Sequence, residues 1–329
     1  MALPIYATPG QRIWHYCYLA FCVFVLFFLV APLVAVIPLS FTSTPFLNFT
    51  PEMLALDPDA FSIRWYKTLF GICGDVDASA STMCHNKWMT GAGRSLYYAV
   101  CSTILATFLG TLAALGLSNQ HMPAKRAIMA LMISPLIVPL IITAAGMAFF
   151  FAKVNLSNTD AGIILAYTIL GMPFVVITVT STLVGFDRSL MRAGANLGGT
   201  PAYNFFKIQM PLIAPGMISG ALFAFITAFD EIVIILFIGG PQQHTLPRQM
   251  WSGIRQEISP TILAAATILV LFSVLLLTTL ELLRRRSERI RGLTPHYCRL
   301  TTWCTTCTPT KTAFKSSLLP SLLESRTTV

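Results

Sequence analysis

The feature that most constrains this fold is a set of six long apolar runs, at residues 14–39, 95–117, 128–151, 162–184, 216–238 and 261–283. A helix that crosses the hydrocarbon core of a bilayer needs about 20 mostly apolar residues, and each run is long enough. The chain is only 11% charged, against about 25% in an average soluble domain. Because the runs are continuous and do not alternate as barrel strands do, we predict an all-α polytopic membrane protein with six transmembrane helices.

The runs divide the chain into three parts. Residues 1–13 form a short N-terminal segment, residues 14–291 form the six-helix transmembrane domain, and residues 292–329 form a tail rich in Thr and Ser. The tail lacks helical periodicity, so we expect it to be disordered. The first run is too long for a signal-peptide core and has no clean cleavage site, so we keep it as a helix.

Lys and Arg residues predict the orientation because they are enriched in short cytoplasmic loops. If the N-terminus is cytoplasmic, the inside segments hold Arg12, Lys125, Arg126, Arg188, Arg192, Lys207 and the basic run 284–291, whereas the outside holds Arg64, Lys67, Lys87, Arg94, Lys153, Arg248 and Arg255. We therefore expect both termini in the cytoplasm. Membrane topology then explains the formal charge of +9 without a nucleic acid partner.

Two of the eight cysteines, Cys73 and Cys84, share the long outside loop. If that loop lies in an oxidising compartment such as a bacterial periplasm, they are candidates for a disulfide that closes it. The alternative is two reduced thiols. His296 and three cysteines of the tail match no defensible zinc module, so we predict no metal site.

Sequence signatures of catalysis are missing from the chain. It has no G-x-x-x-x-G-K-[ST], which excludes that device for binding nucleotide phosphates. Neither H-E-x-x-H nor G-x-S-x-G occurs, and the five histidines lie in different segments. We therefore expect a conduit or a scaffold that binds no cofactor, and not an enzyme.

A polar segment at residues 187–213 separates the fourth and fifth apolar runs. Its pattern predicts a short helix over residues 187–197 that Gly198 and Gly199 end, since glycine tolerates the left-handed conformation. Thr200 then caps a second helix, Pro201 fills its first turn and Pro211 ends it. On that helix Tyr203, Phe206 and Met210 form one apolar stripe. The stripe can face a partner protein, or it can lie among lipid headgroups.

The same residues resemble a known family. Permease subunits of ABC importers carry a cytoplasmic loop with the pattern E-A-A-x3-G-x9-I-x-L-P. At those offsets this chain has Arg192, Ala193, Gly194, Gly198, Ile208, Met210 and Pro211. Arg192 replaces the acid of the pattern and Gly194 replaces its second alanine. The resemblance covers about residues 14–291, and the segment from "FAFITAFDEIVIILFIGG" onward is similar to the spermidine/putrescine-type branch.

This resemblance implies a six-helix type I ABC importer permease in a bacterial inner membrane. It implies as partners a second permease, a dimer of cytoplasmic ATPases that use the ATP, and a periplasmic substrate-binding protein. Residues 187–213 would then be the segment that couples the permease to the ATPase, and the substrate would be a small cation such as a polyamine. An opine, an amino-acid derivative or a phosphonate stays open as the substrate. Outside this class, a self-sufficient secondary transporter or a structural subunit stays open.

Two adjacent acids, Asp230 and Glu231, lie within the fifth apolar run. Acidic side chains at membrane depth are costly and usually face a cavity or a partner charge. Successive helix residues point about 100° apart, so we expect one acid, Asp230, to face the substrate pathway and the other to contact a neighbouring helix. The alternative is an acid pair that anchors the helix at the outer membrane interface.

Overall fold

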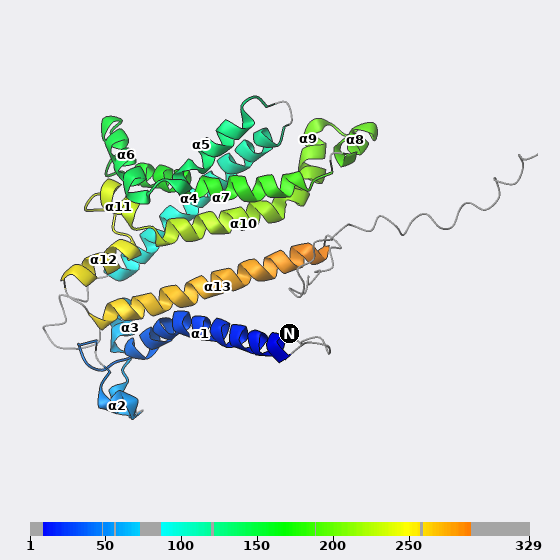
Figure 1. Ribbon diagram of the computed structural model, residues 1–329. Helices are drawn as coiled ribbons and strands as arrows, with labels where there is room; N and C mark the ends of the chain where they lie inside the picture. Colours follow the sequence, from blue (N-terminus) through cyan, green and yellow to red (C-terminus); the bar gives the residue numbers. More distant parts are fainter. Residues whose placement is uncertain are drawn as a thin grey trace, which may run out of the picture.

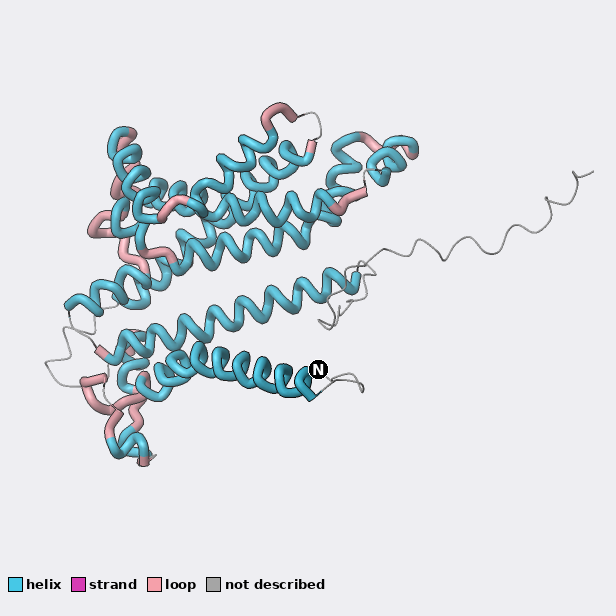
Figure 2. Tube along the Cα trace, in the orientation of Figure 1, coloured by secondary structure: helices cyan, strands magenta, loops and turns pink. Residues whose placement is uncertain are grey.

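The fold is that of a computed structural model, which describes residues 9–47, 49–55, 57–72, 87–119, 122–187, 189–256 and 259–290. The predicted Cys73–Cys84 disulfide and the tail after Gly292 lie outside these residues. The described part is helical apart from loops and one isolated bridge between Thr42 and Phe61 (Figure 2).

The helices follow one another along the chain as labelled in Figure 1. They are α1 (Pro9–Leu39), α2 (Pro51–Leu54), a 3₁₀ turn (Pro58–Ala60), α3 (Arg64–Leu69), α4 (Lys87–Ser118), α5 (Lys125–Ile137), α6 (Leu140–Lys153), α7 (Asp160–Val184), α8 (Ser189–Asn196), α9 (Pro201–Asn204), a π-helical turn (Phe205–Gln209), α10 (Met210–Asp230), α11 (Val233–Ile238), α12 (Leu246–Gln256) and α13 (Pro260–Ile290).

The centre of the molecule is a close-packed bundle of α4, α7 and α10. Helix α10 carries a stripe of small buried residues at every fourth position, Gly216, Gly220, Ala224 and Ala228. A Cβ atom at Gly220 would lie 2.8 Å from the Cα atom of Val175 on α7. Small residues of this kind let helix backbones approach closely, which is how membrane helices associate when no hydrophobic effect drives them together.

Helices α1 and α13 lie side by side, and α13 also contacts α10 of this bundle (Figure 1). Aromatic rings join α13 to α10, with Phe272 5.2 Å from Phe229 between ring centroids. Helix α3 packs on α13 and buries Trp65, whose Nε1 donates a 2.7 Å hydrogen bond to the carbonyl of Thr42. No residue of α1 is buried, so most of its apolar side chains are available to lipid or to another protein.

Five described helices are long and apolar enough to cross a membrane, and a sixth crossing is complete if α5 and α6 count as one bent span. This agrees with the predicted polytopic helical class. The third run was expected to be one helix, but α5 and α6 meet at an angle of 105°. Proline disfavours a helical conformation in the residue before it. Accordingly Val138, which precedes Pro139, is extended at φ −73° and ψ 136°.

The prediction of one helix over residues 216–238 is also wrong. The helical path starts earlier, at Pro201, and ends at Asp230, after which Glu231 adopts an extended ψ of 123°. The chain then forms the separate short helix α11, whose Ile234, Ile235 and Ile238 pack into the core against α6 and α7. The two acids therefore lie at a break between helices and not within a continuous span.

Candidate coupling segment and acid pair

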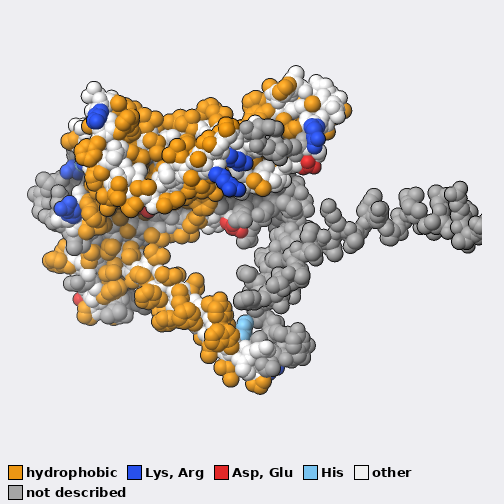
Figure 3. Space-filling view, turned by 45° about the horizontal axis from the view of Figure 1, so that its top comes forward, with side chains coloured by type: hydrophobic (Ala, Val, Ile, Leu, Met, Phe, Trp, Pro, Cys, Tyr) orange, Lys and Arg blue, Asp and Glu red, His pale blue; other side chains and the backbone are white. Residues whose placement is uncertain are grey.

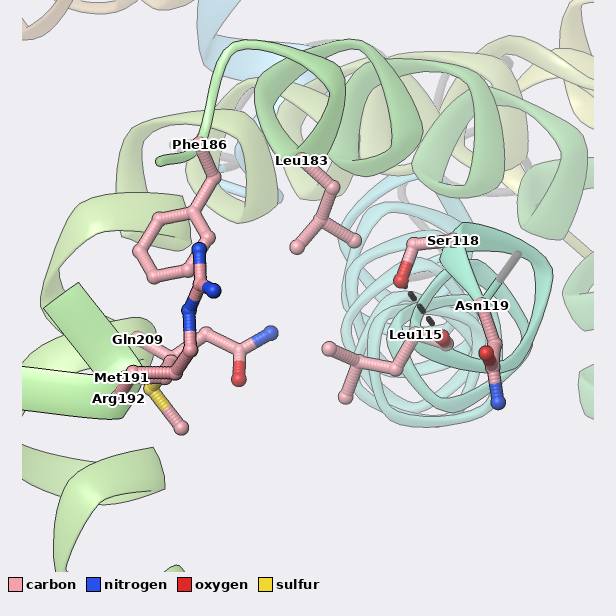
Figure 4. A pocket seen from close by; sticks show the side chains of 8 residues that line it. All are labelled: Leu115, Ser118, Asn119, Leu183, Phe186, Met191, Arg192 and Gln209. Carbon is pink, nitrogen blue, oxygen red and sulfur yellow. Dashed lines mark hydrogen bonds between the residues drawn. The ribbon is translucent and has the colours of Figure 1, made fainter. Parts of the chain in front are cut away.

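The segment between α7 and α10 folds at one end of the bundle, next to the ends of α4 and α7 (Figures 1 and 4). Helix α8 covers most of the predicted first helix. Gly198 follows it with φ +83°, the left-handed conformation that was expected there. The Thr200 side chain accepts a 3.3 Å hydrogen bond from the backbone N–H of Tyr203, and Pro201 fills the first turn. The local turn chemistry is therefore confirmed.

The expectation that Pro211 ends the second helix is wrong. The chain passes from α9 through the π-helical turn into α10 without a break, and Pro211 lies in the first turn of α10. In the π-helical turn the N–H of Met210 donates to the carbonyl of Phe205, five residues back. Proline has no N–H to offer the carbonyl four residues back and its ring clashes with that group. One wider turn removes this conflict without ending the helix.

Gly194 and Asn204 hold the two arms of the segment together. A Cβ atom at position 194 would lie 2.7 Å from Oδ1 of Asn204 and 2.7 Å from Cδ1 of Ile208. Asn204 is buried, and its Nδ2 donates a 3.3 Å hydrogen bond to the carbonyl of Gly199. The departure of Gly194 from the family pattern thus has a steric cause. Its missing methyl group leaves the space that the Asn204 amide fills.

The outer surface of the segment is apolar and basic. Leu197 is 90% exposed, Phe206 62% and Tyr203 58%. Arg192, Ala193 and Lys207 are exposed as well. Asp187, before α8, is already engaged, because its carboxylate accepts hydrogen bonds from the side chain and backbone N–H of Ser189 at 2.7 and 2.8 Å. These bonds lower the pKa of Asp187.

A pocket of about 710 Å³ separates the segment from the rest of the bundle. Figure 4 shows the Arg192 side chain running beside the ring of Phe186 on one wall, with residues from the end of α4 on the other. The pocket is lined by Leu115, Ser118, Asn119, Leu183, Phe186, Met191, Arg192 and Gln209. The segment is therefore connected to the bundle mainly through the continuous helix into α10.

The two acids have different environments. Glu231 is only 9% exposed, and its Oε1 accepts hydrogen bonds from the N–H groups of Val233 at 2.6 Å and Ile234 at 3.2 Å. It thereby caps α11. Its own carbonyl accepts a 3.1 Å hydrogen bond from the buried Tyr167 hydroxyl. Asp230 is exposed at the end of α10, where its carboxylate makes no hydrogen bond or salt bridge to the other described residues.

Asn204 and Tyr167 are two residues of these arrangements that the sequence analysis missed. Asn204 sits among residues that match the family pattern, but the pattern assigns it no role. Tyr167 lies 64 residues before its partner, and no local spacing marks such a pair. For Tyr167 the available signal was a hydroxyl within an apolar run, since such a group needs a hydrogen-bond partner when it is buried.

Comparison with known proteins decides the family. A family model described as the binding-protein-dependent transport system inner membrane component matches residues 106–289. The chain belongs to this family. It is the permease subunit of an ABC importer, a non-catalytic, multi-pass inner-membrane protein that binds no cofactor, while a partner ATPase uses the ATP. This excludes the secondary transporter and the purely structural subunit that the sequence left open.

Two of the relatives that the chain resembles are named for polyamine transport. The chain is 30% identical over 250 residues to the putrescine transport system permease protein PotI of Escherichia coli, covering 74% of this chain and 82% of that one. It is 27% identical over 241 residues to the spermidine/putrescine transport system permease protein PotC of Haemophilus influenzae, covering 73% and 89%. A solved bacterial ABC transporter that imports alginate shares the fold, with TM-score 0.61 and 12% identity over 85% of this chain and 99% of that one.

Proposed function

We propose that this permease imports a polyamine of the spermidine or putrescine type. The observation that supports it most directly is the similarity to PotI and PotC, whose names state these substrates. A polyamine is a flexible cation at neutral pH, so its route through the permease must offset the hydration that each ammonium group loses. Among the residues that the structure describes, the end of one helix has that property.

That place is the end of α10 at Asp230. The C-terminus of a helix carries a partial negative charge from its unpaired carbonyl groups. An acidic residue there is unfavourable for the helix itself, which makes Asp230 costly unless a cation binds nearby. The carboxylate is exposed and makes no contact with a described basic group. In this proposal Asp230 receives an ammonium group of the substrate, and Glu231 holds the break open by capping α11.

The exposed face of α8, α9 and the π-helical turn is the proposed contact with the ATPase. Leu197, Tyr203 and Phe206 would dock in a groove of that partner, so closure of the ATPase dimer on ATP would move α10 directly. In the same proposal residues 14–291 form the complete permease domain, both termini are cytoplasmic, a second permease completes the pathway, and a periplasmic binding protein delivers the substrate.

The test is uptake of radiolabelled putrescine and spermidine by proteoliposomes that contain the whole transporter. We expect Asp230→Asn to raise the apparent KM about tenfold, which is the loss of about 1.4 kcal/mol of binding, with normal assembly. Glu231→Gln retains the shape of the side chain but weakens a charge-assisted cap. We expect it to lower the melting temperature and the yield of assembled protein more than the affinity for substrate.

Two results would contradict the proposal. If Asp230→Asn and the parent protein take up both polyamines with the same KM and rate, Asp230 is not on the route. If the parent transporter takes up neither polyamine but does take up an opine or a phosphonate, the assigned substrate class is wrong.

A further inference from the structure

A group of basic side chains surrounds His244 at the end of the molecule opposite the coupling segment. We propose that this outer basic cluster, Lys87, Arg94, His244 and Arg248, is the surface on which a carboxylate-rich face of the substrate-binding protein docks. The inference rests on the proposed function for the side of the membrane and for the class of partner. The inference adds two things to that function. It names the surface of the permease that binds the substrate-binding protein, and it states that the matching face of that protein is negatively charged.

Packing of α4 against the loop before α12 brings the cluster together. A Cβ atom at Gly91 would lie 3.5 Å from the backbone N of Leu246 and 3.5 Å from the carbonyl carbon of Thr245. The side chain of Ser95 accepts a 2.8 Å hydrogen bond from the N–H of Leu246. Lys87, Gly91 and Arg94 recur at helical spacing on this face of α4. Lys87 and Arg94 therefore flank the loop that carries His244.

Arg248 fixes the loop from the other side. Its Nη1 donates hydrogen bonds to three backbone carbonyls, those of Gly240 at 2.8 Å, Gln243 at 3.1 Å and Gly239 at 3.3 Å. These partners are uncharged, so they orient the guanidinium without neutralising it. The loop is thereby a rigid platform. Its exposed member, His244, is held in a fixed place next to three cations.

Acid is scarce at this platform. Among the described residues Asp160 is the acid that contacts the loop, through a 3.4 Å hydrogen bond from Nε2 of Gln243. The same Asp160 oxygen also accepts a 2.7 Å bond from the hydroxyl of Tyr98. Partial burial and the charges of Arg248, Arg94 and Lys87 lower the pKa of His244. Among the described residues, one carboxylate thus stands beside three cations, which leaves the cluster with an excess of positive charge.

Membrane insertion does not explain this cluster. Lys and Arg are enriched on the cytoplasmic side, and the coupling segment lies at the opposite end, so the proposed orientation places the cluster outside. Figure 3 shows Lys and Arg side chains at the left end of the molecule, the end at which α12 lies in Figure 1. A cluster that keeps basic residues on the unfavoured side calls for a partner of opposite charge.

The partner is a protein surface and not the free substrate. A cationic polyamine would be repelled by the cluster, whereas an acidic protein face would be attracted and could shield its cargo during delivery. Helix α12 adds exposed apolar groups beside the cluster, Trp251 at 44% and Ile254 at 50% exposure. Trp and Arg are the residues most often found to dominate protein interfaces. Charge complementarity of this kind steers association and sets which partner is accepted.

The experiment measures the Kd of the purified substrate-binding protein of the same transport system for the complete transporter in lipid nanodiscs. The test variant is Lys87→Glu combined with His244→Glu. The matched control is Lys153→Glu, an exposed lysine at the end of α6 that is not among the cations acting on His244. We expect the test variant to raise Kd at least tenfold at low salt, and the difference to shrink at about 0.5 M salt because salt screens exposed charges.

Three results would overturn the inference. One is a Kd that the double variant leaves unchanged while melting curves and subunit composition show an intact transporter. Another is an equal rise of Kd in the Lys153→Glu control, which would indicate a general charge effect. The third is a rise that appears in anionic nanodiscs but not in neutral ones, which would assign the cluster to lipid headgroups. Failure of the proposed function looks different, because the parent transporter would then take up neither polyamine while it still binds the substrate-binding protein of its own system.

Discussion

Gly194 and Asn204 form a tight contact within the coupling segment. We expect Gly194→Ala to destabilise the segment by about 1–3 kcal/mol, the usual cost of forcing an extra methyl group into a packed site. The new Cβ atom would lie 2.7 Å from both Oδ1 of Asn204 and Cδ1 of Ile208. Uptake per ATP hydrolysed should therefore fall, because α8 can no longer sit at its present angle. The measurement is uptake and ATP hydrolysis in the same proteoliposomes.

A second substitution tests the steric explanation. Asn204→Ala removes the hydrogen bond to Gly199 but also removes one of the two atoms that the new methyl group would meet, leaving Cδ1 of Ile208. The double variant Gly194→Ala with Asn204→Ala should therefore be less impaired than the sum of the two single variants. Strictly additive losses would show that the two side chains do not interact in the working transporter.

At the scale of the helix, Pro211 keeps the π-helical turn in place. Pro211→Ala restores an N–H that can donate to the carbonyl of Lys207, so we expect Phe205–Gln209 to become α-helical. Losing the extra residue of a π turn rotates everything before it by about 100° around the axis of α10. The coupling surface would then face another direction. Uptake should fall about tenfold while insertion and assembly stay normal.

Pro215 supplies the matched control for this change. It lies one turn further along, inside the regular part of α10. Pro215→Ala also restores one backbone N–H but has no wide turn to remove, so uptake should change little. If both proline variants reduced uptake equally, the π-helical turn would have no special part in coupling. Circular dichroism and subunit composition of the purified transporters confirm that each variant is folded.

Helix existence could be predicted from the sequence, but helix continuity could not. Run length and composition alone identified every crossing segment, because a bilayer requires about 20 apolar residues whatever their order. Likewise the left-handed conformation of Gly198 and the cap formed by Thr200 involve only atoms within three residues. The turn between α8 and α9 could therefore be predicted from local sequence. The break after Asp230 depends instead on the Glu231 carboxylate turning back to cap α11, and on Tyr167 from another helix. Residue composition carries no information about either contact.

The whole molecule has two chemically different ends joined by an apolar bundle. One end holds the exposed apolar groups of the coupling segment, and the other holds the outer basic cluster around His244. Both proposed partners therefore bind along one axis, with the broken helix at Asp230 between them. The helical path from Pro201 to Asp230 is continuous. A movement of the coupling segment would therefore be transmitted along this helix to the break after Asp230.

The direction of this axis in the membrane can be tested with single cysteines in a variant from which the native cysteines have been replaced. Lys125→Cys lies at the start of α5 and Lys153→Cys at the end of α6, and both positions are exposed. The Lys and Arg distribution predicts that position 125 is cytoplasmic and position 153 is outside. A membrane-impermeant maleimide should therefore label Lys153→Cys in intact cells, and Lys125→Cys only after the membrane is permeabilised. The opposite labelling would place the outer basic cluster in the cytoplasm, where membrane topology alone accounts for its charge, and the coupling segment would then face the wrong compartment for an ATPase.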